Sequence, residues 1–387
     1  MTLRIAFTGG GTGGHIYPAL AIDGALRARH PGAYDARFFG NRGGLEASLV
    51  TTMPLSFVPS AALQRRLSLG TLRTAFANAA GVFVALRGLA RFRPAMVVAT
   101  GGYVCFPVVV AARVLRLLRV ARPRIALLEI NAVPGLTNRL LAPLVDEVWA
   151  TYAASAASFG AKTVVTGTPT RASLRSLAPA EVARERLGLD PARTTVVVMG
   201  GSQGARSINQ AVVELVTERT LPPDWQVLHV SGERDHASMD EQQRRAMPGN
   251  RVRLVPYLPD PADAYAAADV VVARAGASTL AELAVTATPA VLVPYPFAAE
   301  QHQARNAALF AAGGAAVVMT DDALDGERLL ETLRTVLEPA RNAAMRTAAR
   351  SLVPPDAAGT IAERIARATG TNGARVAGAV SANEQRP

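Results

Sequence analysis

Glycine-rich turns after short apolar runs are the feature that most constrains how this chain can fold. The segment "GGGTGGHIYPALA" (residues 9–21) places five glycines in six positions directly after the apolar run 3–7. Three later segments repeat the order of apolar strand, glycine and helix: "MVVATGGYV" (96–104), "VVVMGGSQGA" (196–205) and "VVVARAGASTLAE" (270–282). In open parallel α/β sheets such turns lie at the carboxyl edge, where ligands bind.

The four turns share the chemistry of phosphate binding. Glycine lets backbone N–H groups approach a ligand closely, and the helix that follows presents unpaired N–H groups and a positive dipole end to an anion. Two turns fall in each half of the chain, so we expect a cleft between two domains, lined by phosphate-binding turns. For any single turn, a tight connection that binds nothing is the alternative.

Two common nucleotide sites fit these motifs poorly. The first turn has the spacing G-x-G-x-x-G of dinucleotide-binding loops. The second expected strand, however, is followed by Asn41 and Arg42, where such a site needs a carboxylate for the ribose. The segment "GGSQGARS" (200–207) lacks the Lys-Ser/Thr pair of a P-loop. The sequence therefore disfavours NAD-dependent chemistry and hydrolysis of nucleoside triphosphates.

Short apolar runs alternate with longer helical patterns, as in βαβ units that build parallel sheets. The expected strands are 3–7, 36–39, 96–99, 125–128 and 147–150 in the first half, and 164–166, 195–199, 226–230, 252–255, 270–273, 290–293 and 316–319 in the second. We therefore expect an α/β fold of two doubly wound, Rossmann-like domains, at residues 1–163 and 164–350. The tail 369–387 is rich in Gly, Ala and Ser and is expected to be disordered.

Composition indicates a reducing compartment and a basic surface. Cys105 is the one cysteine among 387 residues, so no intrachain disulfide can form. The net charge of +11 comes almost entirely from arginine, and no Asp or Glu lies between Ala47 and Leu128. We expect one face of the N-terminal domain to be basic. Glycines break the leading apolar run at Gly9, which argues against a signal peptide.

Polar residues beside the turns are candidates for chemistry. His15 stands in the first turn of an expected helix, where the helix N-terminus disfavours imidazolium, so a neutral ring could accept a proton. Glu282 follows the fourth turn and could accept hydrogen bonds from two ribose hydroxyls. The segment "EQHQARNA" (300–307) offers amides that suit sugar hydroxyls. A capping histidine, a dipole-favoured glutamate and a polar helix start are the structural alternatives.

The segment 69–93, "LGTLRTAFANAAGVFVALRGLARFR", combines apolar residues near helical spacing with flanking arginines. Such a segment can lie in a membrane interface against anionic head groups. A surface helix that packs its apolar stripe on its own domain is the alternative. The surrounding sequence, which is rich in arginine and contains no Asp or Glu, favours membrane contact.

Six motifs together resemble the MurG family. They are "GGTGGHIYPALA", "ATGGYV", "EINAVPGLTNRLLA", "GGSQGA", "ARAGASTLAE" and "EQHQARNA", in the family's order. By this resemblance the chain is a GT-B glycosyltransferase that moves N-acetylglucosamine from UDP-N-acetylglucosamine to undecaprenyl-pyrophosphoryl-MurNAc-pentapeptide in peptidoglycan synthesis. The family also implies that a last helix, about 353–368, packs back on the N-terminal domain.

The resemblance implies roles for individual residues. The UDP-N-acetylglucosamine site would comprise Thr12, Gly13, Gly14, Asn131, Arg171, Ser202, Leu258, Ala277, Ser278, Thr279, Leu280, Ala281, Glu282 and Gln303. The acceptor pyrophosphate would face Gly11, Gly101, Gly102 and Tyr103. Where the family commonly reads His-Glu-Gln-Asn, this chain has Leu-Glu-Ile-Asn at 128–131. The family's hydrogen-bonding shell around Glu129 and Asn131 is therefore not carried over.

The implied mechanism is direct displacement at C1 of N-acetylglucosamine by the 4-hydroxyl of MurNAc, with inversion. His15 is the first candidate for the general base and Glu129 the second. Loop N–H groups, Ser202 and Arg171 would stabilise the leaving pyrophosphate, so neither a metal nor a cofactor is expected. A UDP-N-acetylglucosamine 2-epimerase on the same fold and a non-catalytic nucleotide-sugar sensor at the membrane are the alternatives.

The implied setting is the cytoplasmic face of the bacterial inner membrane, with the chain bound peripherally to anionic phospholipids. Other cell-wall synthesis proteins would be partners there, and nucleic acid would not. The process served would be cell-wall biogenesis, and through it cell shape and cell division.

Overall fold

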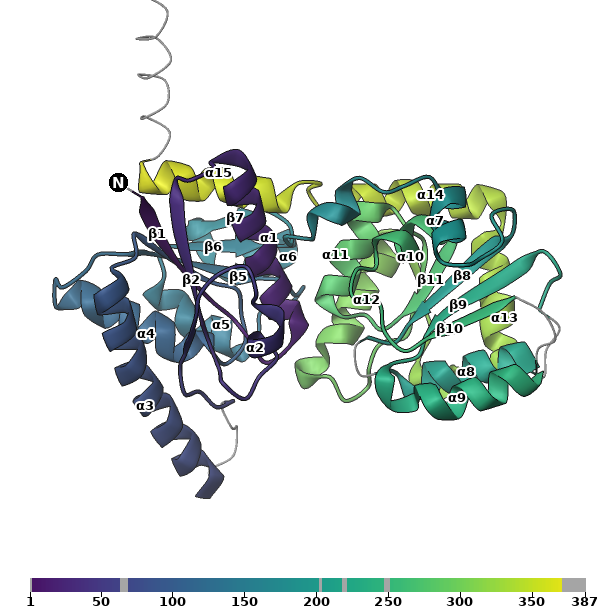
Figure 1. Ribbon diagram of the computed structural model, residues 1–387, viewed down its shortest axis with the longest axis horizontal. Coiled ribbons are helices and arrows are strands. Elements are labelled where there is room, and N and C mark those ends of the chain that lie inside the picture. The colour runs from purple at the N-terminus through teal and green to yellow at the C-terminus, as the bar shows by residue number, and fades with distance from the viewer. Residues whose placement is uncertain (1, 63–68, 202–203, 218–220, 247–250, 371–387) are drawn as a thin grey trace, which may run out of the picture. The chain divides into compact units, whose positions relative to one another are not determined.

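The computed structural model describes residues 2–62, 69–201, 204–217, 221–246 and 251–370, which form two compact units (Figure 1). The first unit runs to Arg171 and takes up the chain again from Asp356, whereas the second unit is Ala172–Pro355. Most of the tail expected to be disordered, from residue 371 onward, lies outside the described residues.

The first unit is built on a parallel sheet of seven strands in the order β3-β2-β1-β4-β5-β6-β7. The strands are Leu3–Thr8 (β1), Tyr34–Gly40 (β2), Leu55–Phe57 (β3), Met96–Ala99 (β4), Arg124–Glu129 (β5), Glu147–Ala150 (β6) and Thr163–Val165 (β7). From β1 the chain builds the sheet in one direction, and from β4 it builds it in the other. The boundary between β1 and β4 is therefore a topological switch point.

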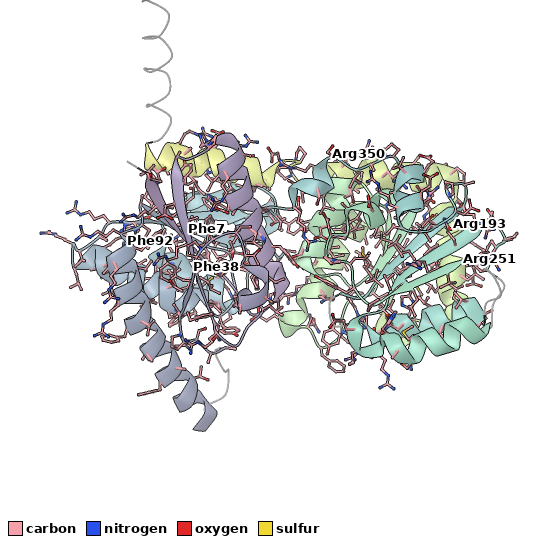
Figure 2. All side chains as sticks on the ribbon, viewed as in Figure 1. Phe7, Phe38, Phe92, Arg193, Arg251 and Arg350 are labelled. Carbon is pink, nitrogen blue, oxygen red and sulfur yellow. The ribbon has the colours of Figure 1, made fainter. Side chains whose placement is uncertain are left out.

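Helices flank this sheet and supply its core. They are Gly13–Arg29 (α1), Glu46–Leu49 (α2), Leu69–Phe92 (α3), Cys105–Leu117 (α4), Leu136–Leu141 (α5), Ala153–Ala156 (α6) and Ala357–Thr369 (α15), with short 3-10 turns at Ala142–Leu144 and Gly160–Lys162. Strand residues such as Phe7 and Phe38, which are labelled in Figure 2, are fully buried because helices cover the parallel sheet. The last helix, α15, packs against α1 within this unit.

The second unit contains a parallel sheet of six strands in the order β10-β9-β8-β11-β12-β13. The strands are Thr194–Met199 (β8), Trp225–Val230 (β9), Val252–Val255 (β10), Val270–Ala273 (β11), Ala290–Leu292 (β12) and Ala316–Val318 (β13). Its switch point lies between β8 and β11. The helices are Ala180–Arg186 (α7), Arg206–Thr217 (α8), Glu233–Ala246 (α9), Ala262–Ala267 (α10), Ala277–Thr286 (α11), His302–Ala312 (α12), Gly326–Leu337 (α13) and Pro339–Ser351 (α14), with 3-10 turns at Ala172–Arg175, Ala299–Gln301 and Asp321–Ala323.

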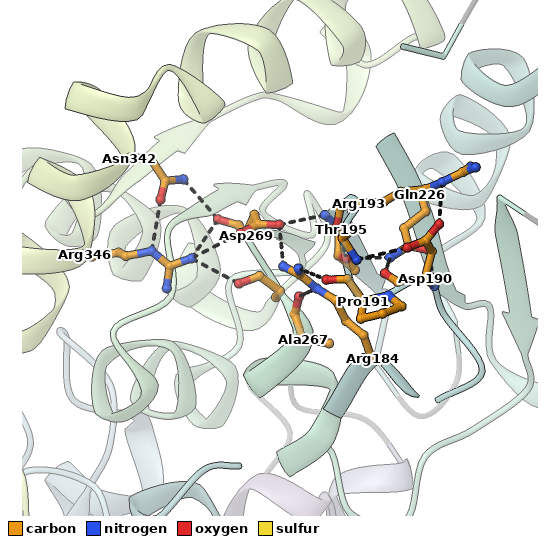
Figure 3. A network of polar contacts seen from close by, with 12 residues as sticks. Arg184, Asp190, Pro191, Arg193, Thr195, Gln226, Ala267, Asp269, Asn342 and Arg346 are labelled. Carbon is orange, nitrogen blue, oxygen red and sulfur yellow. Dashed lines mark hydrogen bonds and ion pairs between the residues drawn. The ribbon is translucent and has the colours of Figure 1, made fainter. Parts of the chain in front are cut away.

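Polar contacts close the amino ends of β8 and β11 (Figure 3). Asp269, just before β11, accepts hydrogen bonds from the backbone N–H of Thr195 at 2.7 Å and from Arg184 at 2.8 Å. Gln226 bonds both backbone groups of Asp190 and the Thr195 hydroxyl. These contacts lie at the edge opposite the carboxyl ends of the strands, where ligands bind in open parallel sheets.

The structure confirms the expected strands to within about two residues at each end, with one addition and one reassignment. Strand β3 is a short edge strand that the sequence analysis missed. Strand β7 was expected in the second domain, but its backbone pairs with β6 and extends the first sheet. This pairing explains why the first unit continues to Arg171 rather than ending at residue 163.

Candidate functional site

The glycine turns converge on the two switch points. In the first unit, the turns that follow β1 and β4 come from adjacent strands on either side of the reversal. In the second unit, the turns that follow β8 and β11 have the same relation. Since ligands bind outside the carboxyl ends of strands at such reversals, the topology alone selects these two places.

In the first unit the two turns interlock through their backbones. The Gly10 N–H donates to the Gly101 carbonyl at 3.3 Å. A Cβ on Gly102 would lie 2.1 Å from the Gly10 carbonyl oxygen, so only glycine allows this approach. Gly11 packs against the ring of Tyr103. Four residues expected at the acceptor pyrophosphate, Gly11, Gly101, Gly102 and Tyr103, are thus brought together.

His15 is held against this pair of turns. Its Nδ1 lies 3.2 Å from the Thr100 carbonyl oxygen, and the Thr100 hydroxyl donates to the His15 carbonyl at 2.5 Å. A carbonyl oxygen can only accept, so Nδ1 carries the proton in this bond and the lone pair of a neutral ring is on Nε2. Gly101 has a φ of +106° and a Cβ there would lie 2.6 Å from Nδ1. Glycine at 101 therefore makes room for the imidazole.

The buried Cys105 supports the second turn and is chemically quiet. The Gly101 N–H donates to its sulfur at 3.3 Å, and the thiol lies within hydrogen-bond distance of the Thr8 and Gly101 carbonyls. Burial raises the pKa of the Cys105 thiol to about 12. A thiol protonated to that extent is a packing residue rather than a nucleophile.

Glu129 ends β5 and organises the loop that follows. One carboxylate oxygen accepts from the backbone N–H of Asn131 at 2.9 Å and from its side-chain amide at 3.2 Å. The other accepts from the Gly135 N–H at 3.1 Å and from the Asn138 amide at 2.8 Å. Burial raises the pKa of Glu129, and these four bonds oppose the rise. All four partners donate, so the contacts fit the carboxylate form.

The remaining expected residues of the first unit lie at the start of α1 and at the end of the unit. Thr12 is the N-cap residue of α1 and is exposed, and Gly13 and Gly14 begin the helix. The guanidinium of Arg171 stacks on the ring of Tyr17 at 4.0 Å from its centroid. Arg171 therefore stands beside the first-unit helix that carries His15.

In the second unit the switch point borders a cavity of about 1180 Å³. The lining includes the glycine turn after β8, the start of α8 and the turn after β11, and its residues are Gly200, Gly201, Gly204, Ala205, Arg206, Ser207, Asn209, Gln210, Val213, Glu214, Arg234, Asp235, Ser238, Met239, Arg274, Gly276, Thr279, Tyr295, Gln303 and Asp321. Glycine backbone, a helix N-terminus and arginine are the groups that bind phosphates.

Arg274 is one of three arginines that line this cavity. Its guanidinium forms an ion pair with Asp321 and donates to the Ser207 hydroxyl at 2.8 Å. It also donates to the Val293 carbonyl at 3.2 Å. These partners follow β8, β12 and β13, so Arg274 ties together the carboxyl ends of several strands.

The expected donor residues that the structure describes in the second unit divide into three groups. Thr279 and Gln303 line the cavity, and Gln303 accepts a hydrogen bond from the Tyr295 N–H at 2.9 Å. Ala277, Leu280 and Ala281 are buried in the core side of α11, whereas Ser278, Glu282 and Leu258 are partly exposed outside the lining. Glu282 accepts a hydrogen bond from the Tyr265 hydroxyl at 2.9 Å. Ser202 lies outside the described residues.

Two residues in left-handed backbone conformation precede Gln303. Glu300 and Gln301 have φ angles of +52° and +54°, which L-residues other than Asn and Asp rarely adopt. Such strain is concentrated at functional sites. The observation supports the segment "EQHQARNA" as part of the site, although Asn306 within it is buried.

Sequence reasoning missed Ser207, Arg274 and Asp321 as a connected group. Each directly or closely follows a strand or turn at the carboxyl edge, which is the signal that could have found them. Among the described residues no group of three or more His, Cys, Asp or Glu side chains is arranged to hold a metal ion.

Comparison with known proteins agrees with this division of the chain. The glycosyltransferase family 28 N-terminal domain matches residues 5–150, and the glycosyltransferase family 28 C-terminal domain matches residues 195–361. Among solved structures, the crystal structure of MurG from Acinetobacter baumannii has a TM-score of 0.72 at 24% identity, covering 94% of this chain and 99% of that one. This likeness shows that the fold is that of MurG.

Curated relatives share more of the sequence. A protein of Desulforudis audaxviator is 39% identical over 381 residues, which are 95% of this chain and 99% of that protein. A protein of Desulfitobacterium hafniense is 40% identical over 363 residues, 92% of this chain and 96% of that protein. Both are named UDP-N-acetylglucosamine--N-acetylmuramyl-(pentapeptide) pyrophosphoryl-undecaprenol N-acetylglucosamine transferase. The chain therefore belongs to glycosyltransferase family 28, and within it to the MurG family of N-acetylglucosaminyltransferases.

Proposed function

We propose that this chain transfers N-acetylglucosamine from UDP-N-acetylglucosamine to the 4-hydroxyl of MurNAc in undecaprenyl-pyrophosphoryl-MurNAc-pentapeptide. Relatives that bear the name of this reaction match the chain over nearly its whole length. The observation that carries the proposal is the pair of glycine-lined switch points, one bordering a phosphate-type cavity and one holding an oriented histidine. These are the parts that a nucleotide-sugar donor and a hydroxyl acceptor require.

The proposed step is a single displacement with inversion. The acceptor oxygen forms a bond to C1 of N-acetylglucosamine while the bond from C1 to the β-phosphate oxygen breaks, and UDP leaves with that electron pair. The proton of the hydroxyl passes to Nε2 of His15, whose tautomer is set by Nδ1–H and the Thr100 carbonyl. Backbone N–H groups at the second-unit cavity, Ser202 and Arg171 stabilise the charge that grows on UDP.

Glu129 has a different part in this proposal from the one the sequence suggested. Its two oxygens accept four hydrogen bonds from the segment 131–138 that follows β5. We assign it to positioning Asn131, which the family resemblance places on the donor sugar. His15 then remains the base. The other first-unit residues, Thr12, Gly13 and Gly14, keep their expected place beside the sugar.

In the same proposal the nucleotide lies against the second unit. Thr279 and Gln303 are at the cavity itself. Glu282 and Leu258 reach the ribose and uracil from outside the lining, and Ala277, Ser278, Leu280 and Ala281 contribute through the backbone at the start of α11.

The chain is proposed to work as a peripheral enzyme on the cytoplasmic face of an anionic membrane. Helix α3 contains one stretch, Thr74–Phe92, long and apolar enough to span a membrane, and 28% of it is buried. Phe76 is 80% exposed, and Arg87 stacks on the exposed ring of Phe83 at 4.1 Å. An amphipathic helix with exposed aromatic rings and arginines suits a lipid interface.

The first unit also has a basic cavity of about 520 Å³. It is lined by Arg113, Arg116, Leu117, Arg119, Arg122, Pro123, Arg124 and Asp146. The single carboxylate is already paired with Arg116, and the neighbouring Leu117 and Leu118 are more than half exposed.

Vesicle co-flotation tests the membrane proposal. We expect the chain to float with phosphatidylglycerol vesicles but not with phosphatidylcholine vesicles. The double variant Phe76→Ser/Phe83→Ser should lose this binding.

The experiment for the reaction is transfer of labelled N-acetylglucosamine to the lipid acceptor, with and without a chelator. Label in the lipid phase, insensitive to the chelator, is expected. Conversion of UDP-N-acetylglucosamine to its 2-epimer would make the chain an epimerase. Binding without any turnover would make it a nucleotide-sugar sensor.

A further inference from the structure

The buried glutamate Glu46 lies beneath the first glycine turn and has no part in the mechanism above. It begins α2, its side chain is fully buried, and one carboxylate oxygen accepts a hydrogen bond from the Gly11 N–H at 3.3 Å. Its other oxygen is buried and has no hydrogen-bond partner among the described residues. Burying a carboxylate with one oxygen unbonded costs folding free energy, so its presence calls for a specific explanation.

Glycines on three sides make the space for this carboxylate. A Cβ on Gly10 would lie 1.7 Å from one carboxylate oxygen, and a Cβ on Gly44 would lie 1.9 Å from the other. A Cβ on Gly40, the last residue of β2, would lie 2.9 Å from Cγ of Glu46. The carboxylate therefore occupies a slot that is bordered by three glycines.

The same slot fixes the turn that faces the acceptor. Gly11 has a φ of +86°, and a Cβ there would lie 2.9 Å from the ring of Tyr103. Gly11 is thus held between the Glu46 carboxylate and Tyr103. Its neighbour Gly10 is bonded to Gly101 in the second turn. Since the turn leads into α1, its conformation also sets where His15 stands.

We propose that Glu46 is a positioning residue for the acceptor side of the site. It accepts the Gly11 N–H and so holds the turn 9–14 in the conformation that meets the acceptor pyrophosphate. Gly11 then shapes the site but gives its N–H to Glu46 rather than to a phosphate. The kinetic part of this inference rests on the proposed function, whereas the structural part does not.

Three variants distinguish the position of the accepting Glu46 oxygen from the negative charge of the carboxylate. Glu46→Gln keeps an acceptor oxygen for Gly11, Glu46→Asp withdraws the carboxylate by one methylene, and Glu46→Ala removes it. The matched control is Asp35→Asn, which removes one exposed carboxylate from β2 in the same unit. Thermal unfolding of each variant identifies any that fail to fold.

The first readout is amide hydrogen exchange of a peptide covering residues 9–17, measured without substrate. Exchange should accelerate about tenfold in Glu46→Ala and Glu46→Asp and stay near wild type in Glu46→Gln and Asp35→Asn. Unchanged exchange in Glu46→Ala, or faster exchange spread evenly over the first unit, would overturn the inference.

The second readout is kinetic. Glu46→Asp should lower kcat/KM for the lipid acceptor about tenfold and leave KM for UDP-N-acetylglucosamine unchanged, with recovery in Glu46→Gln. An equal loss of kcat/KM for both substrates would contradict a positioning role on the acceptor side. So would a Glu46→Gln variant that fails to recover kcat/KM for the acceptor. If the wild-type chain transfers nothing, the proposed function fails, and the exchange experiment still decides whether Glu46 holds the turn.

Discussion

The two switch points share one backbone pattern but use it differently. In the first unit, N–H groups of the first glycine turn bond inward, Gly10 to Gly101 and Gly11 to Glu46. In the second unit, the equivalent turns border a cavity of about 1180 Å³ whose lining includes Arg274. A glycine turn therefore does not by itself indicate a phosphate site. In the first unit the buried Glu46 accepts an N–H of the turn, whereas in the second unit the turns line an open cavity.

This comparison predicts that substitutions in the two units break different steps. The largest effect is expected for His15→Ala, which removes the proposed base. Transfer should fall by about 10²–10⁴-fold, the usual range for losing a general base, while UDP binding is retained. The measurement is the steady-state transfer rate together with UDP calorimetry.

The control for His15 is His30→Gln, at the other end of the same helix. His30 is the C-cap residue of α1 and its ring packs edge-on against Tyr34. Transfer should stay within about twofold of wild type. Near-normal transfer in His15→Ala would remove that residue from the mechanism.

A second substitution tests the interlocking of the first-unit turns. Gly101→Ala forces an L-residue to a φ of +106° and places Cβ 2.6 Å from His15 Nδ1. Displacing the imidazole by about 1 Å should cost about 10²-fold in transfer. Gly24→Ala is the matched control, because it lies exposed within α1 with nothing near the added methyl group. That control should gain about 0.5–1 kcal/mol in the free energy of unfolding, and an active Gly101→Ala would contradict the proposed geometry.

Substitutions at the second-unit cavity should change the affinity for the nucleotide donor. Arg274→Met removes the guanidinium that lines the cavity and pairs with Asp321, so UDP affinity should fall about tenfold. Arg253→Gln, exposed on β10 and outside the cavity, should bind UDP as wild type does. Unchanged UDP affinity in Arg274→Met would place the nucleotide elsewhere.

The smallest effect is a pH dependence confined to the second unit. Burial, with a contribution from His236, lowers the pKa of His229 to about 3. The unfolded chain binds this proton near pH 6.5, so the free energy of unfolding should fall by about 1.4 kcal/mol between pH 7.5 and 5.5. His229→Gln should flatten that slope, as measured by chemical denaturation at each pH. An equal slope in the variant would assign the effect to another group.

The strands were predictable because buried parallel strands read as continuous apolar runs. Val270–Ala273 is one such run, and its glycine turn could be read from the sequence together with it. Strand β3 escaped because it is three residues long and lies at the sheet edge. Strand β7 was assigned to the wrong sheet because its pairing partner, β6, is set by tertiary structure rather than by its own residues.

The sequence predicted the glycine turns of the candidate site, but not all of the side chains that hold those turns in place. Thr100, which orients His15, stands in the motif that the sequence analysis identified. Glu46 reaches the first turn from elsewhere in the sequence, so no local pattern indicates its role. Asp321 follows a strand end, but its pairing with Arg274 depends on tertiary structure. Glu129 was identified from its motif, but only the four hydrogen bonds that its carboxylate accepts favour the proposed positioning role over base catalysis.

Calorimetric titration of UDP into wild type, His15→Ala and Arg274→Met tests whether the nucleotide binds at the second-unit switch point while the first unit carries the transfer chemistry. We expect wild-type UDP affinity in His15→Ala and about tenfold weaker binding in Arg274→Met. Weakened UDP binding in His15→Ala with unchanged binding in Arg274→Met would contradict this assignment.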